Sequence, residues 1–315
     1  MNEATKIKIF KRINRILLKP VFGPPWPFAV QRTWFKLVAA TSLLPKGTRI
    51  EKVAMAKIPA EVIVNVAHGT QENSQQKVIL YLHGGAYSIC APQTHRSLTA
   101  SLANKTQAKV FVPDYKLAPE HPFPAGIEDC LSSYQWLLEQ GYCADNIVIA
   151  GDSAGAGLAM ATIQRIREIK ISQPAAVILI SPWSDLTLAS EGKVNDAIDP
   201  LLRWSNLRAG VKAYLQGQDP KNPLASPAFA NFSDLPPILV QVGTEEILLN
   251  DANKLQQQAQ KYQAKLELSI YQGGWHVFQL QAGLLEISDR AIKEIDDFIN
   301  EFIPQKSSKR GNYAK

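Results

Sequence analysis

A serine inside a glycine-rich turn is the residue of this chain best suited to do chemistry. The segment Gly151-Asp152-Ser153-Ala154-Gly155 directly follows the apolar run 146–150 and directly precedes the helix-like stretch 157–169. A serine hydroxyl is a weak nucleophile at neutral pH, so it needs a tight strand-to-helix turn that exposes it beside a base. Small glycines let the strand and helix approach closely, and the serine then lies near the positive end of the helix. The segment therefore predicts a serine hydrolase.

The base that must accompany this serine is identified by its order in the chain. In folds with this type of turn, the serine is followed by the acid and then by the histidine. Of the five histidines only His276 lies after Ser153, in a loop at 273–278 that follows the strand-like run 266–271. We expect His276 to be the general base.

The acid that orients the histidine is expected just after the strand-like run 238–242. Three carboxylates compete there, namely Glu245, Glu246 and Asp251. Either residue type can accept a hydrogen bond from the imidazole and stabilise the imidazolium. Asp251 is also suited to cap the next helix. The residue types alone leave the choice open.

Backbone N–H groups for an oxyanion are predicted in the segment 83–86, which follows an apolar strand-like run. A tetrahedral intermediate of acyl transfer carries an oxyanion, and removing one donor costs roughly 3 kcal/mol. The candidate donors are the amides of Gly84, Gly85 and Ala86, joined by that of Ala154 after the nucleophile. The alternative is a simple turn, because adjacent glycines are common turn residues.

The elements that must position these groups alternate along the chain between strands and helices. Strands are expected at 62–66, 78–82, 109–113, 147–150, 176–180, 238–242 and 266–271, and helices at about 95–104, 126–140, 154–169, 251–264 and 283–302. Near-continuous apolar strands separated by helices indicate an α/β fold with a mostly parallel sheet covered on both faces. This alternation of strands and helices is interrupted between about 185 and 232, where no strand is expected and only a helix at 201–215 is indicated. An insertion of this length is typical of a lid.

The basic residues that give the chain its net charge of +6 are concentrated at its ends. Residues 1–20 carry six Lys and Arg, residues 305–315 carry four, and the stretch between is mildly acidic. This distribution argues against a nucleic-acid partner. The N-terminal stretch predicts an amphipathic helix ending near Pro20, with Lys8, Lys11, Arg12, Arg15 and Lys19 on one face and Ile7, Phe10, Ile13 and Leu17 on the other. Its apolar face either covers part of the same protein, the interpretation we favour, or rests on an anionic membrane surface.

The chain carries none of the sequence signals of export or membrane insertion. No apolar run approaches the ~20 residues that span a bilayer, and the N-terminus lacks the apolar centre of a signal peptide. The three cysteines, Cys90, Cys130 and Cys143, are an odd number, which argues against a disulfide framework and favours a cytoplasmic location. No His, Cys or Asp cluster has metal-ligand spacing, so we expect neither a metal nor another cofactor.

Five ordered motifs resemble those of the bacterial hormone-sensitive-lipase-like branch of the α/β hydrolases, a family of carboxylesterases and short-chain lipases. The likeness spans roughly residues 50–303 and rests on the segments 83–87 (HGGAY), 114–125 (DYKLAPEHPFPA), 151–155 (GDSAG), 181–186 (SPWSDL) and 275–278 (WHVF). The family pattern places its acid at the fourth residue of a Gly-x-x-Asp/Glu segment, which here is Glu246. Two departures are Ala86 in place of a third glycine and Glu246 in place of the usual Asp; both keep the required amide or carboxylate.

The resemblance also implies how the chain is divided. Relatives build a cap from the N-terminal segment and from an insertion before the acid, which correspond here to residues 1–50 and about 185–225. The catalytic domain then covers 51–303 and residues 304–315 form a disordered basic tail. In this interpretation Trp26, Phe28, Trp34 and Trp204 are candidate pocket residues.

The resemblance implies a carboxylesterase that cleaves short to medium acyl esters of small molecules through an acyl-enzyme, without a cofactor. A lactone hydrolase or a small-molecule deacetylase with the same triad is the alternative. A non-catalytic binding protein of the same fold is the alternative of another class, although such proteins have lost the histidine that this chain retains as His276. A homodimer is also left open.

Overall fold

The computed structural model describes residues 1–69 and 71–303, so the tail expected at 304–315 lies outside the described residues. At its centre is one eight-stranded sheet with the order β1-β2-β4-β3-β5-β6-β7-β8. The strands are β1 Thr48–Met55, β2 Ile58–Asn65, β3 Val78–Leu82, β4 Lys109–Pro113, β5 Ile147–Asp152, β6 Ala176–Ile180, β7 Ile238–Glu245 and β8 Leu266–Trp275. β1 and β2 are antiparallel to their neighbours, and the remaining pairs are parallel.

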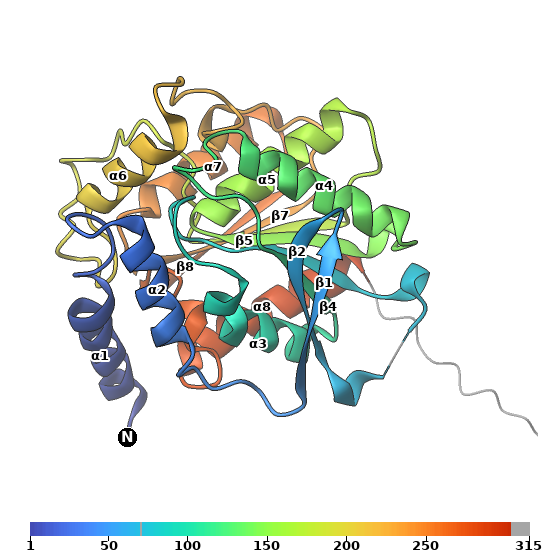
Figure 1. Cartoon of the computed structure of the whole chain (residues 1–315), viewed down its shortest axis with the longest axis horizontal. Coiled ribbons are helices and arrows are strands. Elements are labelled where there is room, and N and C mark those ends of the chain that lie inside the picture. The colour runs from blue at the N-terminus through green and yellow to red at the C-terminus, as the bar shows by residue number, and fades with distance from the viewer. Residues whose placement is uncertain (70, 304–315) are drawn as a thin grey trace, which may run out of the picture.

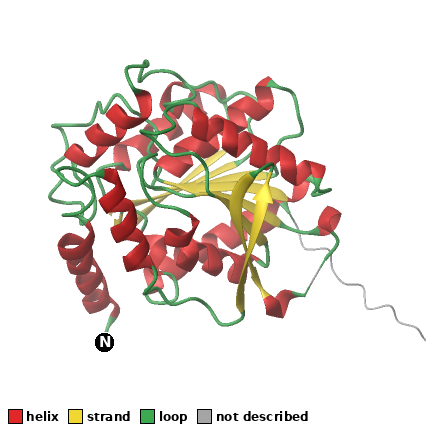
Figure 2. Cartoon of the chain, in the orientation of Figure 1, coloured by secondary structure: helices red, strands yellow, loops and turns green. Residues whose placement is uncertain are grey.

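Helices cover both faces of this sheet, as the layers in Figure 2 show. They are α1 Glu3–Ile13, α2 Phe28–Ala39, α3 Arg96–Thr106, α4 Ala125–Glu139, α5 Ala154–Glu168, α6 Trp204–Leu215, α7 Leu249–Tyr262 and α8 Glu286–Phe302. In Figure 1, α4, α5 and α7 lie on one side of the sheet, whereas α3 and α8 lie on the other. The α/β fold class predicted from the alternation is confirmed.

The central strands are apolar on both sides because each side packs against helices. In β3, for example, Leu80 and Leu82 belong to the apolar cluster on one face, while Ile79 and Tyr81 belong to the cluster on the other. All five residues of β3 and of β6 are buried. The sheet is therefore a rigid platform, and the loops after its parallel strands all emerge at one edge.

The N-terminal segment is the part whose packing differs most from the expected pattern. α1 continues as a π-helical turn at Asn14–Leu18, and both lie beside α2 at one end of the molecule (Figure 1). Lys11 and Lys19, placed on the polar face by the sequence, are buried, whereas Ile13 and Leu17 are exposed. Polar partners on the protein body explain the inversion, as shown below.

Two elements were not predicted from the sequence. β1 alternates between half-buried and exposed positions and carries several charges, so it lacks an apolar run. α2 follows a proline-rich turn and contains exposed Val30 and Leu37, so its apolar residues do not follow one stripe. Among the described residues, no helix combines the length and the apolar character that crossing a membrane requires.

Candidate active site

Ser153 occupies a sharp turn between β5 and α5. Its backbone has φ of 55° and ψ of −120°, a conformation that non-glycine residues rarely adopt and that is stored at functional sites. The turn is held because the Ser153 N–H donates to Ile180 O at 2.9 Å and the Trp183 N–H donates to Ser153 O at 3.0 Å. The predicted strand-turn-helix context of the serine is present.

Close packing around this turn explains the small residue at its end. A Cβ atom at Gly155 would overlap the carbonyl oxygens of Leu82, the last residue of the neighbouring strand β3, and of His83, which follows it. Any larger residue would push α5 away from the sheet and move Ser153. The glycine therefore sets how closely the serine approaches the loop after β3.

The predicted base and one of the three candidate acids are in direct contact. His276 Nδ1 lies 3.0 Å from Glu246 Oε2, and both side chains are almost fully buried. Because an ionised carboxylate only accepts hydrogen bonds, Nδ1 carries the proton and Nε2 is left as the acceptor. Burial lowers the pKa of His276, but the hydrogen bond and charge of Glu246 outweigh burial, so the pKa lies above 6.5.

The two competing carboxylates have other partners. Glu245 forms an ion pair with Lys11 of α1, at 2.7 Å. Asp251 accepts the backbone N–H groups of Ser184 and Asp185, each at 2.9 Å. The expectation that Asp251 caps the next helix is wrong, because α7 starts before it, at Leu249, and its carboxylate points to the loop after β6.

Ser181, to which the sequence analysis gave no role, joins the acid loop to the histidine loop. Its hydroxyl donates to Glu246 Oε1 at 2.8 Å and accepts the N–H of Val277, next to His276, at 3.0 Å. Glu246 Oε1 also accepts the Gly243 N–H at 2.7 Å. The carboxylate is thus fixed by three donors. The signal available in the sequence was the position of Ser181, immediately after a buried strand.

A second buried carboxylate, Asp199, links the 185–225 insertion to this network. Its Oδ2 accepts the N–H of Ile247, the residue after Glu246, at 3.1 Å, and its Oδ1 accepts the N–H groups of Leu201 and Leu202. Burial raises the pKa of Asp199 to about 6, against the opposing charge of His276. Nothing in the local sequence distinguishes Asp199 from a surface turn residue, which is why it was missed.

The loop after β3 presents most of the predicted oxyanion donors. Gly85, with φ of 115°, and Ala86, with φ of 51°, turn the chain back toward Ser153. Within the described chain, their N–H groups and that of Ala154 donate no hydrogen bond. The Gly84 N–H is different, because it donates to Asp152 Oδ1 at 3.0 Å. The Gly84 donor expected from the sequence is therefore already occupied.

Asp152 anchors this loop through a hydrogen bond to its buried carboxylate. Besides Gly84, its Oδ1 accepts the Tyr81 hydroxyl at 2.7 Å, and its Oδ2 lies 3.2 Å from His95 Nε2. Burial raises the pKa of Asp152, but His95 and the Tyr81 hydrogen bond outweigh it, so the pKa lies below the ordinary value. Both nitrogens of His95 are engaged, since Nδ1 contacts Thr94 Oγ1 at 2.8 Å. His95 is therefore unavailable as a base.

Asp152→Ala is expected to lower the free energy of unfolding by about 3–5 kcal/mol, because it leaves buried donors without an acceptor. Asp152→Asn retains one carbonyl oxygen for Gly84 and should lower it by less than half as much. Urea unfolding followed by circular dichroism measures both. Equal stability of the alanine variant and the wild-type protein would contradict this role.

A cavity of about 150 Å³ brings the candidate groups together. Its lining includes Ser153, His276 and Gly85, together with apolar residues of the N-terminal segment such as Phe22 and Phe35. In this structure no hydrogen bond joins the Ser153 hydroxyl to His276; such contacts often tighten only when substrate is bound. Cys90 also lines the cavity, and burial raises the pKa of its thiol to about 12, so it is a neutral wall residue.

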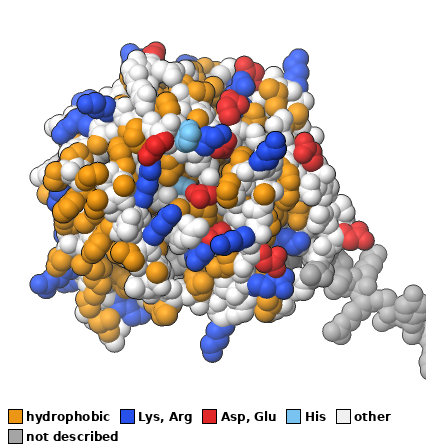
Figure 3. All heavy atoms as spheres, in the orientation of Figure 1, with side chains coloured by type: hydrophobic (Ala, Val, Ile, Leu, Met, Phe, Trp, Pro, Cys, Tyr) orange, Lys and Arg blue, Asp and Glu red, His pale blue; other side chains and the backbone are white. Residues whose placement is uncertain are grey.

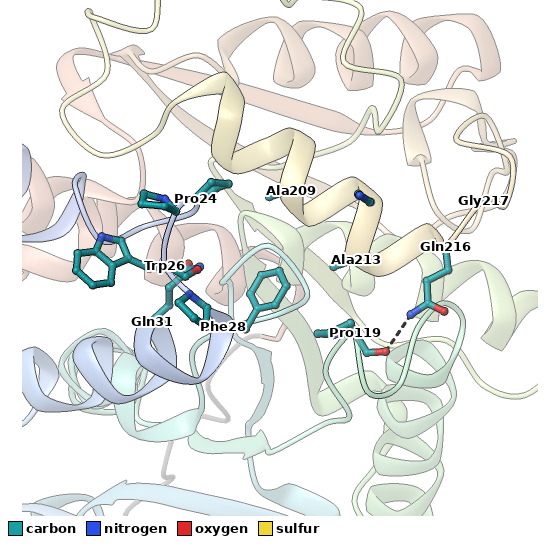
Figure 4. Close-up of a pocket in the computed structure, with 12 residues that line it drawn as sticks. Pro24, Trp26, Phe28, Gln31, Pro119, Ala209, Ala213, Gln216 and Gly217 are labelled. Carbon is teal, nitrogen blue, oxygen red and sulfur yellow. Dashed lines mark hydrogen bonds between the residues drawn. The ribbon is translucent and has the colours of Figure 1, made fainter.

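A larger cavity of about 720 Å³ lies elsewhere, between the Pro24–Phe28 turn and α6 (Figure 4). Two of its lining residues are joined by a hydrogen bond, which Gln216 Nε2 donates to Pro119 O at 2.9 Å. Trp26 and Phe28, candidate pocket residues from the sequence, line this cavity and not the one that contains Ser153. Trp34 and Trp204 line neither and donate to backbone carbonyls instead.

Comparison with known proteins gives consistent matches along the chain. A family described as having the alpha/beta hydrolase fold matches residues 79–280. An acetyl-hydrolase from Streptomyces hygroscopicus is 40% identical over 250 residues, covering 77% of this chain and 83% of that protein. An esterase from Acinetobacter venetianus is 38% identical over 252 residues, covering 79% and 81%. A crystal structure of an esterase from the bacterial hormone-sensitive lipase family matches with a TM-score of 0.88 at 33% identity, covering 96% of this chain and 100% of that one.

Proposed function

The chain belongs to the hormone-sensitive-lipase-like branch of the α/β hydrolases and is a carboxylic-ester hydrolase, and from this premise we propose that Ser153, His276 and Glu246 form its catalytic triad. The observation that carries the proposal is the 3.0 Å contact of His276 Nδ1 with Glu246, beside a cavity that also contains Ser153. Glu246 keeps the imidazole in the tautomer whose Nε2 accepts a proton.

The reaction proceeds in two steps. His276 Nε2 takes the proton of the Ser153 hydroxyl while the oxygen attacks the ester carbonyl, and the imidazolium then protonates the leaving alcohol. Water, deprotonated by the same imidazole, then attacks the acyl carbon; the bond to Ser153 Oγ breaks, the acid is released, and the imidazolium returns its proton to Ser153 Oγ. Glu246 stabilises the imidazolium in both steps and remains ionised.

The oxyanion of each tetrahedral intermediate is bound by the N–H groups of Gly85, Ala86 and Ala154. Support comes from the three amides, which have no partner among the described residues, and from the position of Ala154 at the start of α5. Donors that are already oriented need no reorganisation as charge develops. Gly84 acts through Asp152, by fixing the loop that carries the donors.

Residues 1–50 and the insertion at 185–225 together form a cap. Two buried lysines of the first segment support this proposal. Lys11 pairs with Glu245, and Lys19 Nζ donates to the carbonyl oxygens of Asp196 and Asp199 at 2.7 and 2.5 Å. The cap supplies Phe22 and Leu201 to the lining of the cavity that contains Ser153. The acyl chain then occupies the space between cap and sheet.

The cavity of about 150 Å³ favours small acyl groups, because pockets for drug-sized ligands occupy ~300–1,000 Å³. We expect hydrolysis of p-nitrophenyl esters to be greatest at chains of two to about six carbons, to resist a metal chelator, and to fall steeply by palmitate. Phe35→Ala, which enlarges the cavity, should move the optimum to longer chains, whereas Trp34→Ala, on the same helix but outside the cavity, should not. An unchanged profile in Phe35→Ala would place the acyl chain elsewhere.

Lactones and acetylated small molecules need the same triad and stay as alternative substrates, to be added to the same assay. Failure of a folded protein to cleave any ester would favour the non-catalytic binding protein. For location and assembly, we infer a cytoplasmic protein that forms a homodimer. The three cysteines are all free, and β8 is an edge strand with Ile270 exposed on it, where a second copy could pair.

A further inference from the structure

Exposed apolar side chains are concentrated on the N-terminal segment. Of the sixteen large apolar residues that are exposed in the described chain, ten belong to the first 50 residues. Besides Met1, these residues form what we call the N-terminal face: Ile9, Ile13, Ile16, Leu17, Trp26, Val30, Leu37, Leu43 and Leu44. Figure 3 shows apolar side chains gathered on the side of the molecule where α1 and α2 lie in Figure 1. Exposed apolar patches of this kind mark interaction sites.

The same segment carries a charge of one sign. Residues 1–50 contain ten Lys and Arg and a single acid, Glu3, whereas residues 51–303 contain 20 basic and 27 acidic residues. Six of these basic residues are exposed: Lys8, Arg12, Arg15, Lys36, Lys46 and Arg49. Apolar side chains that enter a lipid surface, flanked by cations that meet its phosphates, are the features by which proteins bind anionic membranes.

This charge pattern also argues against self-association through the N-terminal face. Two copies meeting there would each bring a strongly positive segment, and their repulsion would oppose contact. An anionic lipid surface has the opposite charge and an apolar interior, so it is complementary in both respects.

The inner side of the segment faces the catalytic cavity. Leu18, Phe22, Phe35, Val38 and Ala39 line the cavity that contains Ser153. The segment is held to the body at both of its helices, by Lys11 with Glu245 and by Arg32 with Glu120, each at 2.7 Å. The π-helical turn, the loop after it and α2 therefore carry both cavity-lining residues and exposed residues of the N-terminal face.

We propose that the N-terminal face docks on an anionic phospholipid surface and holds the Ser153 cavity next to it. Only the step after docking, in which an ester passes from the lipid surface through the cap and is hydrolysed, rests on the proposed function. Docking itself uses no catalytic residue.

Co-sedimentation with vesicles of phosphatidylcholine containing phosphatidylglycerol tests the proposal, with pure phosphatidylcholine vesicles as reference. Wild-type protein should bind the anionic vesicles at least tenfold more strongly, and this preference should fade at high salt. The variant Ile16→Glu/Leu37→Glu should lose at least tenfold in binding. Its matched control, Ile169→Glu/Phe229→Glu, makes the same charge change at exposed apolar positions outside the face and should bind like wild type.

Hydrolysis of p-nitrophenyl acetate without vesicles separates this proposal from the proposed function. Neither Ile16 nor Leu37 lines the catalytic cavity, so the face variant should keep wild-type activity, and Ser153→Ala should still bind vesicles. Absence of binding by an active wild-type protein would overturn the docking proposal and leave the esterase intact. Equal binding by the face variant and its control would overturn it too. Sedimentation velocity gives a third test. If the wild-type protein and the control are dimers and the face variant is a monomer, the face binds a second copy and the docking proposal is overturned.

Discussion

Ser153→Ala is expected to lower kcat for p-nitrophenyl butyrate by about 10⁶, the order of loss when the nucleophile of a serine triad is removed. Without the hydroxyl no acyl-enzyme forms, and the oxyanion donors can assist only direct attack by water. The loss should appear in kcat with the fold intact, because Ser153 contributes its backbone to the turn and its side chain to no hydrogen bond in the described chain.

Ser88→Ala is the matched control for the nucleophile. Ser88 is a fully buried serine that follows the oxyanion loop closely in the chain, and its hydroxyl has no partner among the described residues. It should retain wild-type kcat. Treatment with a p-nitrophenyl organophosphate should add one phosphoryl group, located by mass spectrometry on Ser153 and absent from Ser153→Ala. An adduct on another residue would refute the assignment.

Glu246→Gln is expected to lower kcat by roughly 10³–10⁴, because an amide can present its NH₂ group to Nδ1 and favour the wrong tautomer. It should also move the acid limb of kcat/KM to lower pH. Burial alone lowers the pKa of His276, and Glu246 is the main group that raises it above 6.5. When that carboxylate is removed, burial dominates and the imidazole stays neutral to a lower pH. The pH profile of kcat/KM measures the shift.

Glu245→Gln and Asp251→Asn are the controls for the acid. Glu245 is paired with Lys11, and Asp251 holds the loop after β6. Neither contacts His276, so each should keep kcat within about threefold and leave the acid limb in place, as expected for groups outside the transition state. A larger loss in either control than in Glu246→Gln would mean that the acid is misassigned.

Much of the site could be predicted because it lies at the carboxyl ends of buried parallel strands. Ser153 and His276 each follow an apolar run that the sequence shows directly, and the chain order of the triad chose the histidine. The choice among Glu245, Glu246 and Asp251 needed the family pattern. Three carboxylates within seven residues differ only in the direction in which the folded chain points each side chain, and a sequence does not show that direction. The structure separates them by their partners.

What could not be predicted depends on contacts between distant segments. Ser181 and Asp199 look like ordinary loop residues until the chain brings them against Glu246. The same holds for the N-terminal helix, where periodicity placed Lys11 and Lys19 outside. Their partners, the half-buried Glu245 and the carbonyl of the buried Asp199, lie far along the chain. A local pattern cannot reveal a partner of this kind, because burial of a lysine is favourable only where a distant acceptor is provided.

The span between Lys11 and Glu245, 234 residues, has a consequence for how the protein is made. During synthesis the first helix leaves the ribosome long before the strand that carries its partner, so it cannot dock while most of the chain is translated. Its apolar residues stay exposed to water for that time, in a strongly basic segment that is prone to aggregate. Closing so long a loop is also late in folding, since its entropy must be lost before the contact forms. The nascent chain should therefore depend on chaperones chiefly through its first 50 residues.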